Sequence, residues 1–139
     1  MLTVISTVSE EQVSLTKHEE EFQTISGKWQ VIKEEAIKVA SNMSQGWLFH
    51  VKTLHEANMI IGQGNWTVYP LIAWGKRKAF ACSKAPQTCD IIKADFPLAA
   101  DFSLGVAKFE HMFGKTRTIP HCGPVNTRLR MILPLQVTN

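Results

Sequence analysis

Apolar residues recur every three or four positions over the first third of the chain, and this spacing predicts an amphipathic helix. The stripe consists of Phe22, Ile25, Trp29, Ile32, Ala36 and Val39. Residues at these intervals lie on one face of a helix, which would run for roughly seven turns and end near residues 42–46. The stripe suits a helix laid against a sheet, although a short coiled coil would show the same pattern. Residues 1–14 have no such period, and we expect a flexible tail before a domain spanning 15–139.

After residue 64 the pattern changes to short runs that are typical of strands. Trp66–Trp74 is apolar and aromatic but contains Pro70, which favours an edge strand or a bend. Val106–Met112 alternates loosely, and 128–137 gives the clearest strand pattern. A short helix is expected to begin at Cys89. One helix followed by several short strands predicts the α+β class.

Composition and length place the chain among ordinary globular domains. It has 139 residues, of which 45% are hydrophobic and 19% charged. This length fits one domain with a substantial core. No apolar run approaches the roughly 20 residues that a membrane helix needs, so we expect no membrane segment.

Charge is distributed unevenly between the two halves. Residues 1–73 carry five Lys against eight Glu, a net charge of −3, whereas 74–139 carry ten Lys and Arg against four acidic residues, a net charge of +6. A basic half is compatible with nucleic acid or with an anionic small molecule. Because no aromatic residues interleave with the arginines, we favour small carboxylates and expect no nucleic-acid partner.

Two arginines two residues apart give the most informative chemistry. Alternate side chains of a strand point to the same face, so Arg128 and Arg130 are expected side by side, with Leu129 and Met131 facing a core. Paired guanidinium groups can bind carboxylates bidentately. His121 precedes them on a turn rich in Pro and Gly, where it can bind a metal ion or act as a structural hydrogen-bonding residue.

Four segments carry motifs that occur together in one family. They are Pro120-His121-x-Gly123-Pro124-x-Asn126-x-Arg128-Leu129-Arg130-Met131, Ala81-Cys82-x-x-Ala85-Pro86-x-Thr88-Cys89, Gly64-x-Trp66 with Gly75-Lys76-Arg77, and Trp29-x-Val31-Ile32-x-Glu34-Glu35-Ala36. The first motif is fairly specific, the second less so, and the other two are weak alone. Together they span residue 15 to the end and resemble the aspartyl/asparaginyl β-hydroxylases.

The resemblance implies a fold and a reaction. Family members are dioxygenases that use Fe(II) and 2-oxoglutarate, are built on a double-stranded β-helix (a jelly-roll or cupin-like fold), and hydroxylate Asp or Asn in a peptide or protein domain. We therefore expect an N-terminal amphipathic helix followed by an incomplete double-stranded β-helix. It would be incomplete because the second iron-binding histidine and the basic residue that anchors 2-oxoglutarate are expected beyond residue 139.

The resemblance also assigns roles to individual residues. His121 corresponds to the first iron ligand, and Arg130 and Met112 correspond to residues of the co-substrate site. Arg128 and Lys108 correspond to residues that bind the substrate, although Lys108 could equally be a solvated surface charge.

The cysteines leave two interpretations open on spacing alone. Cys82 and Cys89 bracket a short loop that a disulfide could close, with Cys122 left over, or all three could be free thiols. The resemblance favours the disulfide and, with it, the lumen of the endoplasmic reticulum. The sequons that begin at Asn42 and Asn65 fit that compartment.

Two positions depart from the family pattern within the matching region. Glu110 stands where a small hydroxylic residue would contact 2-oxoglutarate, and Ile132 replaces a histidine. With the early end of the chain, these departures predict a family member that is inactive alone. The alternatives are a non-catalytic truncated form, or a basic module whose binding to acidic peptides falls steeply with salt.

Overall fold

The structure is a computed structural model that describes residues 1–7, 15–49, 60–122 and 128–137. Its elements are β1 (Leu2–Thr7), α1 (Leu15–Ser26), α2 (Trp29–Ala40), β2 (Leu48–Phe49), β3 (Ile61–Gln63), β4 (Trp66–Ala73), β5 (Lys76–Arg77), α4 (Ala79–Lys84), α5 (Pro86–Asp95), α6 (Pro97–Asp101), β6 (Val106–Met112), β7 (Arg117–Thr118) and β8 (Arg128–Leu133). The predicted α+β class is confirmed.

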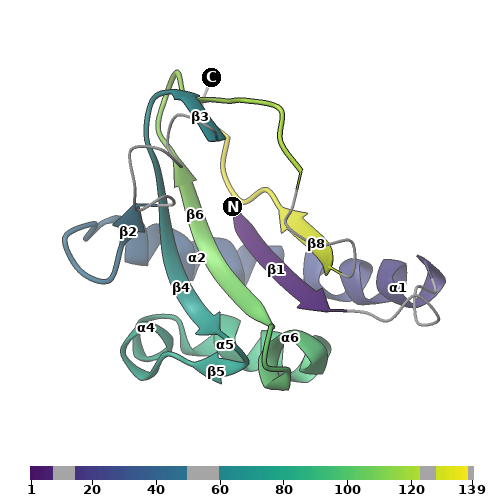
Figure 1. The fold of residues 1–139 in the computed structure, drawn as a ribbon. Helices are drawn as coiled ribbons and strands as arrows, with labels where there is room; N and C mark the ends of the chain where they lie inside the picture. Colours follow the sequence, from purple (N-terminus) through teal and green to yellow (C-terminus); the bar gives the residue numbers. More distant parts are fainter. Residues whose placement is uncertain (8–14, 50–59, 123–127, 138–139) are drawn as a thin grey trace.

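The strands form an antiparallel sheet with helices against one of its faces. The sheet has the order β2-β4-β6-β1-β8, with β5 added to β4, and a separate pair joins β3 to β7. Figure 1 shows α1 and α2 behind the sheet, and α4, α5 and α6 gathered at one end of β4 and β6. These strands do not by themselves make the two facing sheets of a double-stranded β-helix, so that finer assignment remains a prediction.

The expectation of a flexible N-terminal tail is wrong for Leu2–Thr7, which form an interior strand of the sheet. β1 pairs with β6 on one side and with β8 on the other, and Leu2 lies opposite both Phe109 and Leu133. Leu2 and Val4 are buried in the hydrophobic core. A short run rich in β-branched residues gives no helical period, but it suits a strand that is paired on both edges. Residues 8–14, the rest of the predicted tail, lie outside the described part.

The predicted single helix is two helices with a break at Gly27 and Lys28. The Lys28 amide donates to the Ile25 carbonyl, a tighter turn than that of an α-helix. The Ile32 amide then donates to the Lys28 carbonyl, which begins the second helix. Glycine's low helix propensity favours a break here. The apolar stripe continues across the break, because Ile25, Ile32 and Val39 are all buried.

Pro70 accounts for a local irregularity in β4. The register with β6 shifts between Pro70 and Ile72. On its other side β4 pairs with β2 at Thr67 and Val68 and with β5 at Ile72 and Ala73, so Pro70 lies between two short partners. A residue without an amide hydrogen is tolerated at such a position. The prediction of an edge position or a bend is therefore confirmed.

A disulfide and a set of hydrogen bonds join the helices to one another. Cys82 of α4 and Cys89 of α5 form a disulfide, with sulfur atoms 2.09 Å apart, and the predicted pairing is confirmed. The buried carboxylate of Glu35 on α2 accepts the amide hydrogens of Gln87 and Thr88, at 3.0 and 2.7 Å, and the Thr88 hydroxyl at 2.7 Å. Since the first amides of a helix lack partners within it, Glu35 caps α5 from another helix.

Over the described ranges, no helix is both long enough and apolar enough to cross a membrane.

Candidate functional site

The two arginines of β8 lie on the face of the sheet away from the helices. Leu133 is in the core and Met131 packs against it, as the alternation predicts. Arg128 and Arg130 alternate with these residues and therefore point to the opposite face. Arg130 is exposed, and the buried Nε of Arg128 has no hydrogen-bond partner among the described residues. Both side chains thus have donor groups available for an anion.

Lys108 of β6 lies on the same face as the arginines. Thr3 of β1 is paired in register with Lys108 on one side and with Ile132 of β8 on the other. Directly paired residues point to the same side, and Ile132 shares a face with Arg130 because the two are two residues apart on β8. The sheet therefore brings Lys108, Arg128 and Arg130 to one face.

Lys108 has an internal partner on this face. Its Nζ lies 2.6 Å from Oε1 of Glu110, two residues along the strand, and both side chains are buried. The second oxygen of Glu110 accepts the hydroxyl of Thr3 at 2.6 Å. Lys108 is therefore a buried, paired cation and not a solvated surface charge. The alternation of β6 could have revealed this pair, because residues 108 and 110 share a face.

Met112 extends this face toward the end of β6. It is exposed and pairs in register with Trp66 of β4, while Glu110 pairs with Val68. The face therefore changes from basic at β8 to apolar at the far end of β4. The sheet does not bring Met112 next to the arginines, because Arg130 lies across β1 from Val106, at the opposite end of β6.

His121 lies between β7 and β8 with its ring exposed. Its Nδ1 is 2.7 Å from the carbonyl oxygen of Ile119. In the tautomer in which Nδ1 donates this hydrogen bond, Nε2 carries a free lone pair that can bind a metal ion. Residues 123–127 of the motif lie outside the described part.

The described residues do not amount to an iron site. His111, the nearest other histidine in sequence, packs its ring against Phe113 and Trp47 on the helix side of β4 and β6. No group of three His, Cys, Asp or Glu that could hold a metal occurs in the described part, and His50 and His55 lie outside it. One suitable nitrogen is too few to hold Fe(II), so no chemical step is assigned to iron.

Most of this chain is similar in sequence to proteins of one known family. The family model for aspartyl/asparaginyl beta-hydroxylase matches residues 26–139. The chain is 30% identical over 122 residues to aspartyl/asparaginyl beta-hydroxylase from Homo sapiens and 29% identical over 122 residues to that from Mus musculus. Each match covers 88% of this chain, but only 15% of the human relative and 16% of the mouse one. The chain thus belongs to the aspartyl/asparaginyl β-hydroxylase family.

Proposed function

We propose that this chain provides a carboxylate-binding face for the β-hydroxylation of Asp or Asn residues in peptides, a reaction dependent on Fe(II) and 2-oxoglutarate. Family membership supports the general function. The observation that carries the proposal is the pair of arginines on one face, with Arg130 exposed and Arg128 retaining an unpartnered buried donor among the described residues. A dicarboxylate and an aspartyl side chain are both ligands for such donors.

Each residue takes a role that fits its surroundings. Arg130, which is exposed, binds a carboxylate of 2-oxoglutarate. Met112 lies six residues along β6 from Val106, the residue across β1 from Arg130, so the two side chains do not contact the same co-substrate molecule. Arg128 and Lys108 orient the carboxylate or amide of the peptide's Asp or Asn. Lys108 does so only in exchange for Glu110, because its ammonium group is already paired.

We further propose that this chain by itself binds these ligands without turning them over. His121 offers one nitrogen to a metal ion, and the same face carries Glu110 and Ile132. When Lys108 leaves Glu110 for the substrate, the freed carboxylate on this face repels other carboxylates, which weakens binding of 2-oxoglutarate. With Fe(II) added, we expect titratable binding of 2-oxoglutarate but no formation of succinate.

Titration calorimetry with 2-oxoglutarate tests the proposed site directly. Arg130→Ala should weaken binding about tenfold or more, since a charged hydrogen bond contributes about 1.5–3 kcal/mol. Arg77→Ala is the matched control, because Arg77 is exposed on β5 and pairs with Asp90. Equal affinity of the Arg130→Ala and Arg77→Ala variants would refute the assignment.

The conservative variant Arg130→Lys separates this site from a general basic surface. A lysine keeps the charge but loses the planar fork that grips a carboxylate with two hydrogen bonds. We expect Arg130→Lys to bind 2-oxoglutarate nearly as weakly as Arg130→Ala. Undiminished binding in Arg130→Lys, combined with a steep fall of affinity with salt, would instead favour a basic module for acidic peptides.

We also propose that the protein resides in an oxidising compartment, the lumen of the endoplasmic reticulum. The support is the Cys82–Cys89 disulfide, because such bonds persist in oxidising surroundings and are rare in the cytosol. Fractionation of cells that express the chain tests this location, and recovery of the protein with both thiols reduced in the cytosol would contradict it.

A further inference from the structure

The turn that follows α2 presents an asparagine with the sequence context of a modification site. Asn42 is exposed and is followed by Met43 and Ser44, which satisfies the Asn-x-Ser/Thr pattern of N-glycosylation. The Ser44 hydroxyl donates a 2.7 Å hydrogen bond to Oδ1 of Asn42. The amide nitrogen of Asn42, the atom that would carry a sugar, has no hydrogen-bond partner among the described residues.

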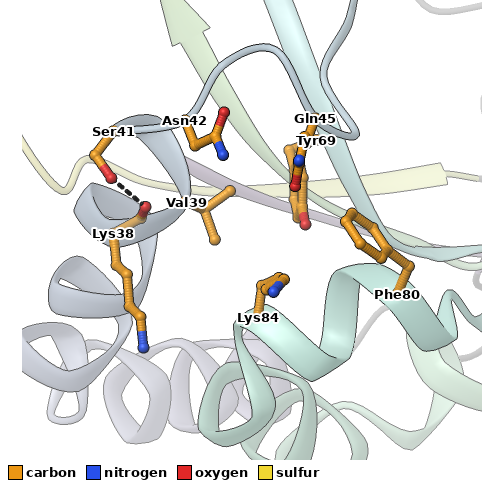
Figure 2. A pocket seen from close by; sticks show the side chains of 8 residues that line it. All are labelled: Lys38, Val39, Ser41, Asn42, Gln45, Tyr69, Phe80 and Lys84. Carbon is orange, nitrogen blue, oxygen red and sulfur yellow. Dashed lines mark hydrogen bonds between the residues drawn. The ribbon is translucent and has the colours of Figure 1, made fainter.

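A pocket of about 250 Å³ lies beside this asparagine, on the helix side of the sheet. That volume far exceeds the roughly 30 Å³ that one water molecule takes up in the liquid. In Figure 2, Asn42 stands at the rim, with its amide nitrogen toward the interior and its oxygen turned away. A group attached to this nitrogen would start at the mouth of the pocket.

The side chains that line the pocket suit a sugar ring. Phe80 of α4 is 52% exposed and can pack against the C–H face of a sugar. Tyr69 of β4 is only 1% exposed, yet Figure 2 shows its hydroxyl pointing into the pocket. Gln45 and Lys84 add an amide and an ammonium group that can bind sugar hydroxyls or an acetamido group.

The second sequon differs from the first in the burial of its other residues and in its distance from the pocket. Asn65 is exposed, but Trp66 and Thr67 that complete its motif are 5% and 8% exposed. The carbonyl of Asn65 accepts the amide hydrogen of Phe113 and the hydroxyl of Thr116. Its backbone is therefore held against the turn between β6 and β7, and it does not line the pocket beside Asn42.

We propose that Asn42 is an N-glycosylation site and that the first sugar of the glycan packs into this pocket. In the reaction, the amide nitrogen of Asn42 forms a bond to the anomeric carbon of an oligosaccharide carried on a lipid pyrophosphate. The bond from that carbon to the pyrophosphate oxygen breaks, the lipid pyrophosphate leaves, and the amide loses one proton. The inference rests on the proposed lumenal location but not on catalysis.

The mass of the full chain directed into the endoplasmic reticulum of cultured cells tests the modification. We expect one N-glycan, removable by peptide-N-glycosidase, that is lost in Asn42→Gln and in Ser44→Ala and retained in Asn65→Gln. An unmodified Asn42 in a chain whose Cys82 and Cys89 are disulfide-bonded would overturn the proposal, because that chain has reached the lumen. The glycan is also expected on Arg130→Ala, so failure of the proposed binding site would leave this result unchanged.

Thermal melts test the packing of the sugar. The glycosylated chain should melt about 3 °C above its enzymatically deglycosylated form, and Phe80→Ala should abolish this difference. The same difference in Phe80→Ala would show that the sugar does not use the pocket. If succinate raises the melting temperature of Asn42→Gln and this effect requires Lys84, the pocket binds a free anion. That result would also overturn the packing proposal.

Discussion

The two faces of the sheet are stabilised in different ways. The helix side is a continuous apolar core to which the helices are joined by the Cys82–Cys89 disulfide and by the Glu35 cap. The other side carries the buried ion pair of Lys108 and Glu110 and, beyond β1, the arginines of β8, where the buried Nε of Arg128 has no partner among the described residues. Apolar packing is spread over many contacts, whereas a buried charge depends on a few specific partners, here Lys108 and Thr3 around Glu110. The comparison indicates that the helix side maintains the fold and that the charged side is suited to exchanging partners.

The largest effect should come from breaking the ion pair on the charged face. Lys108→Met removes the ammonium group that is paired with the buried Glu110 carboxylate, which should lower the free energy of unfolding by about 3–5 kcal/mol. Lys115→Met, at an exposed position, should change it by less than about 0.5 kcal/mol. Urea denaturation measures both variants.

A double variant sharpens this result. Lys108→Met combined with Glu110→Gln removes both charges but keeps an acceptor for the Thr3 hydroxyl, so most of the lost stability should return. If the double variant is as unstable as Lys108→Met alone, the loss comes from packing and not from an unpaired charge.

On the helix side, the largest polar contribution should be that of Glu35. Glu35→Ala deprives two amides and one hydroxyl at the start of α5 of their acceptor, which should cost about 3 kcal/mol. Its neighbour Glu34 is exposed, so Glu34→Ala is a matched control with little expected effect. Chemical denaturation of the pair tests the cap, and equal stability of the two variants would refute it.

The disulfide should contribute slightly less. Closing a loop with a sequence separation of 7 stabilises the fold by about 2.5 kcal/mol in the chain-entropy treatment. We expect Cys82→Ser/Cys89→Ser to lose about this amount in urea and to retain its affinity for 2-oxoglutarate. A large loss of affinity in the folded double variant would show that the two faces are coupled.

The smallest effect is an alkaline one at Tyr69. Burial raises the pKa of this phenol above its ordinary value of 10.0, so the unfolded chain loses the proton first. The stability that the protonated Tyr69 phenol contributes is therefore fully present below pH 10. This contribution is lost as the pH rises toward the pKa of the folded state. Between pH 9 and pH 11, Tyr69→Phe should lose less stability than the natural chain, and equal losses would contradict the shift.

Much of the sheet could be predicted from local patterns. The alternation around Arg128 and Arg130 gave the correct faces of β8, and Pro70 marked the irregular part of β4. These predictions succeeded because a strand's period and proline's missing amide hydrogen act locally. The disulfide was predicted only with the help of the family resemblance, since spacing alone left free thiols possible.

Contacts between residues distant in the sequence explain what was missed. β1 looked like a tail because both of its partners lie more than 100 residues away in the sequence. The role of Glu35 depends on amides 52 and 53 residues further along. The break at Gly27 left the apolar period unchanged, so periodicity could not reveal it. Of the candidate site, the shared face of the arginines was predictable, whereas the position of Lys108 beside them required the order of the strands.

The interior position of β1 has a consequence for how the chain is made. β1 is synthesised before both of its neighbours, β6 and β8, which begin at residues 106 and 128. Neither edge of β1 can be paired until more than 100 further residues have been added. Pairings this far apart in sequence give high contact order, which is associated with slow folding. The nascent chain therefore carries β1 unpaired while these residues are added, and the interior of the sheet forms only after β8 has been synthesised.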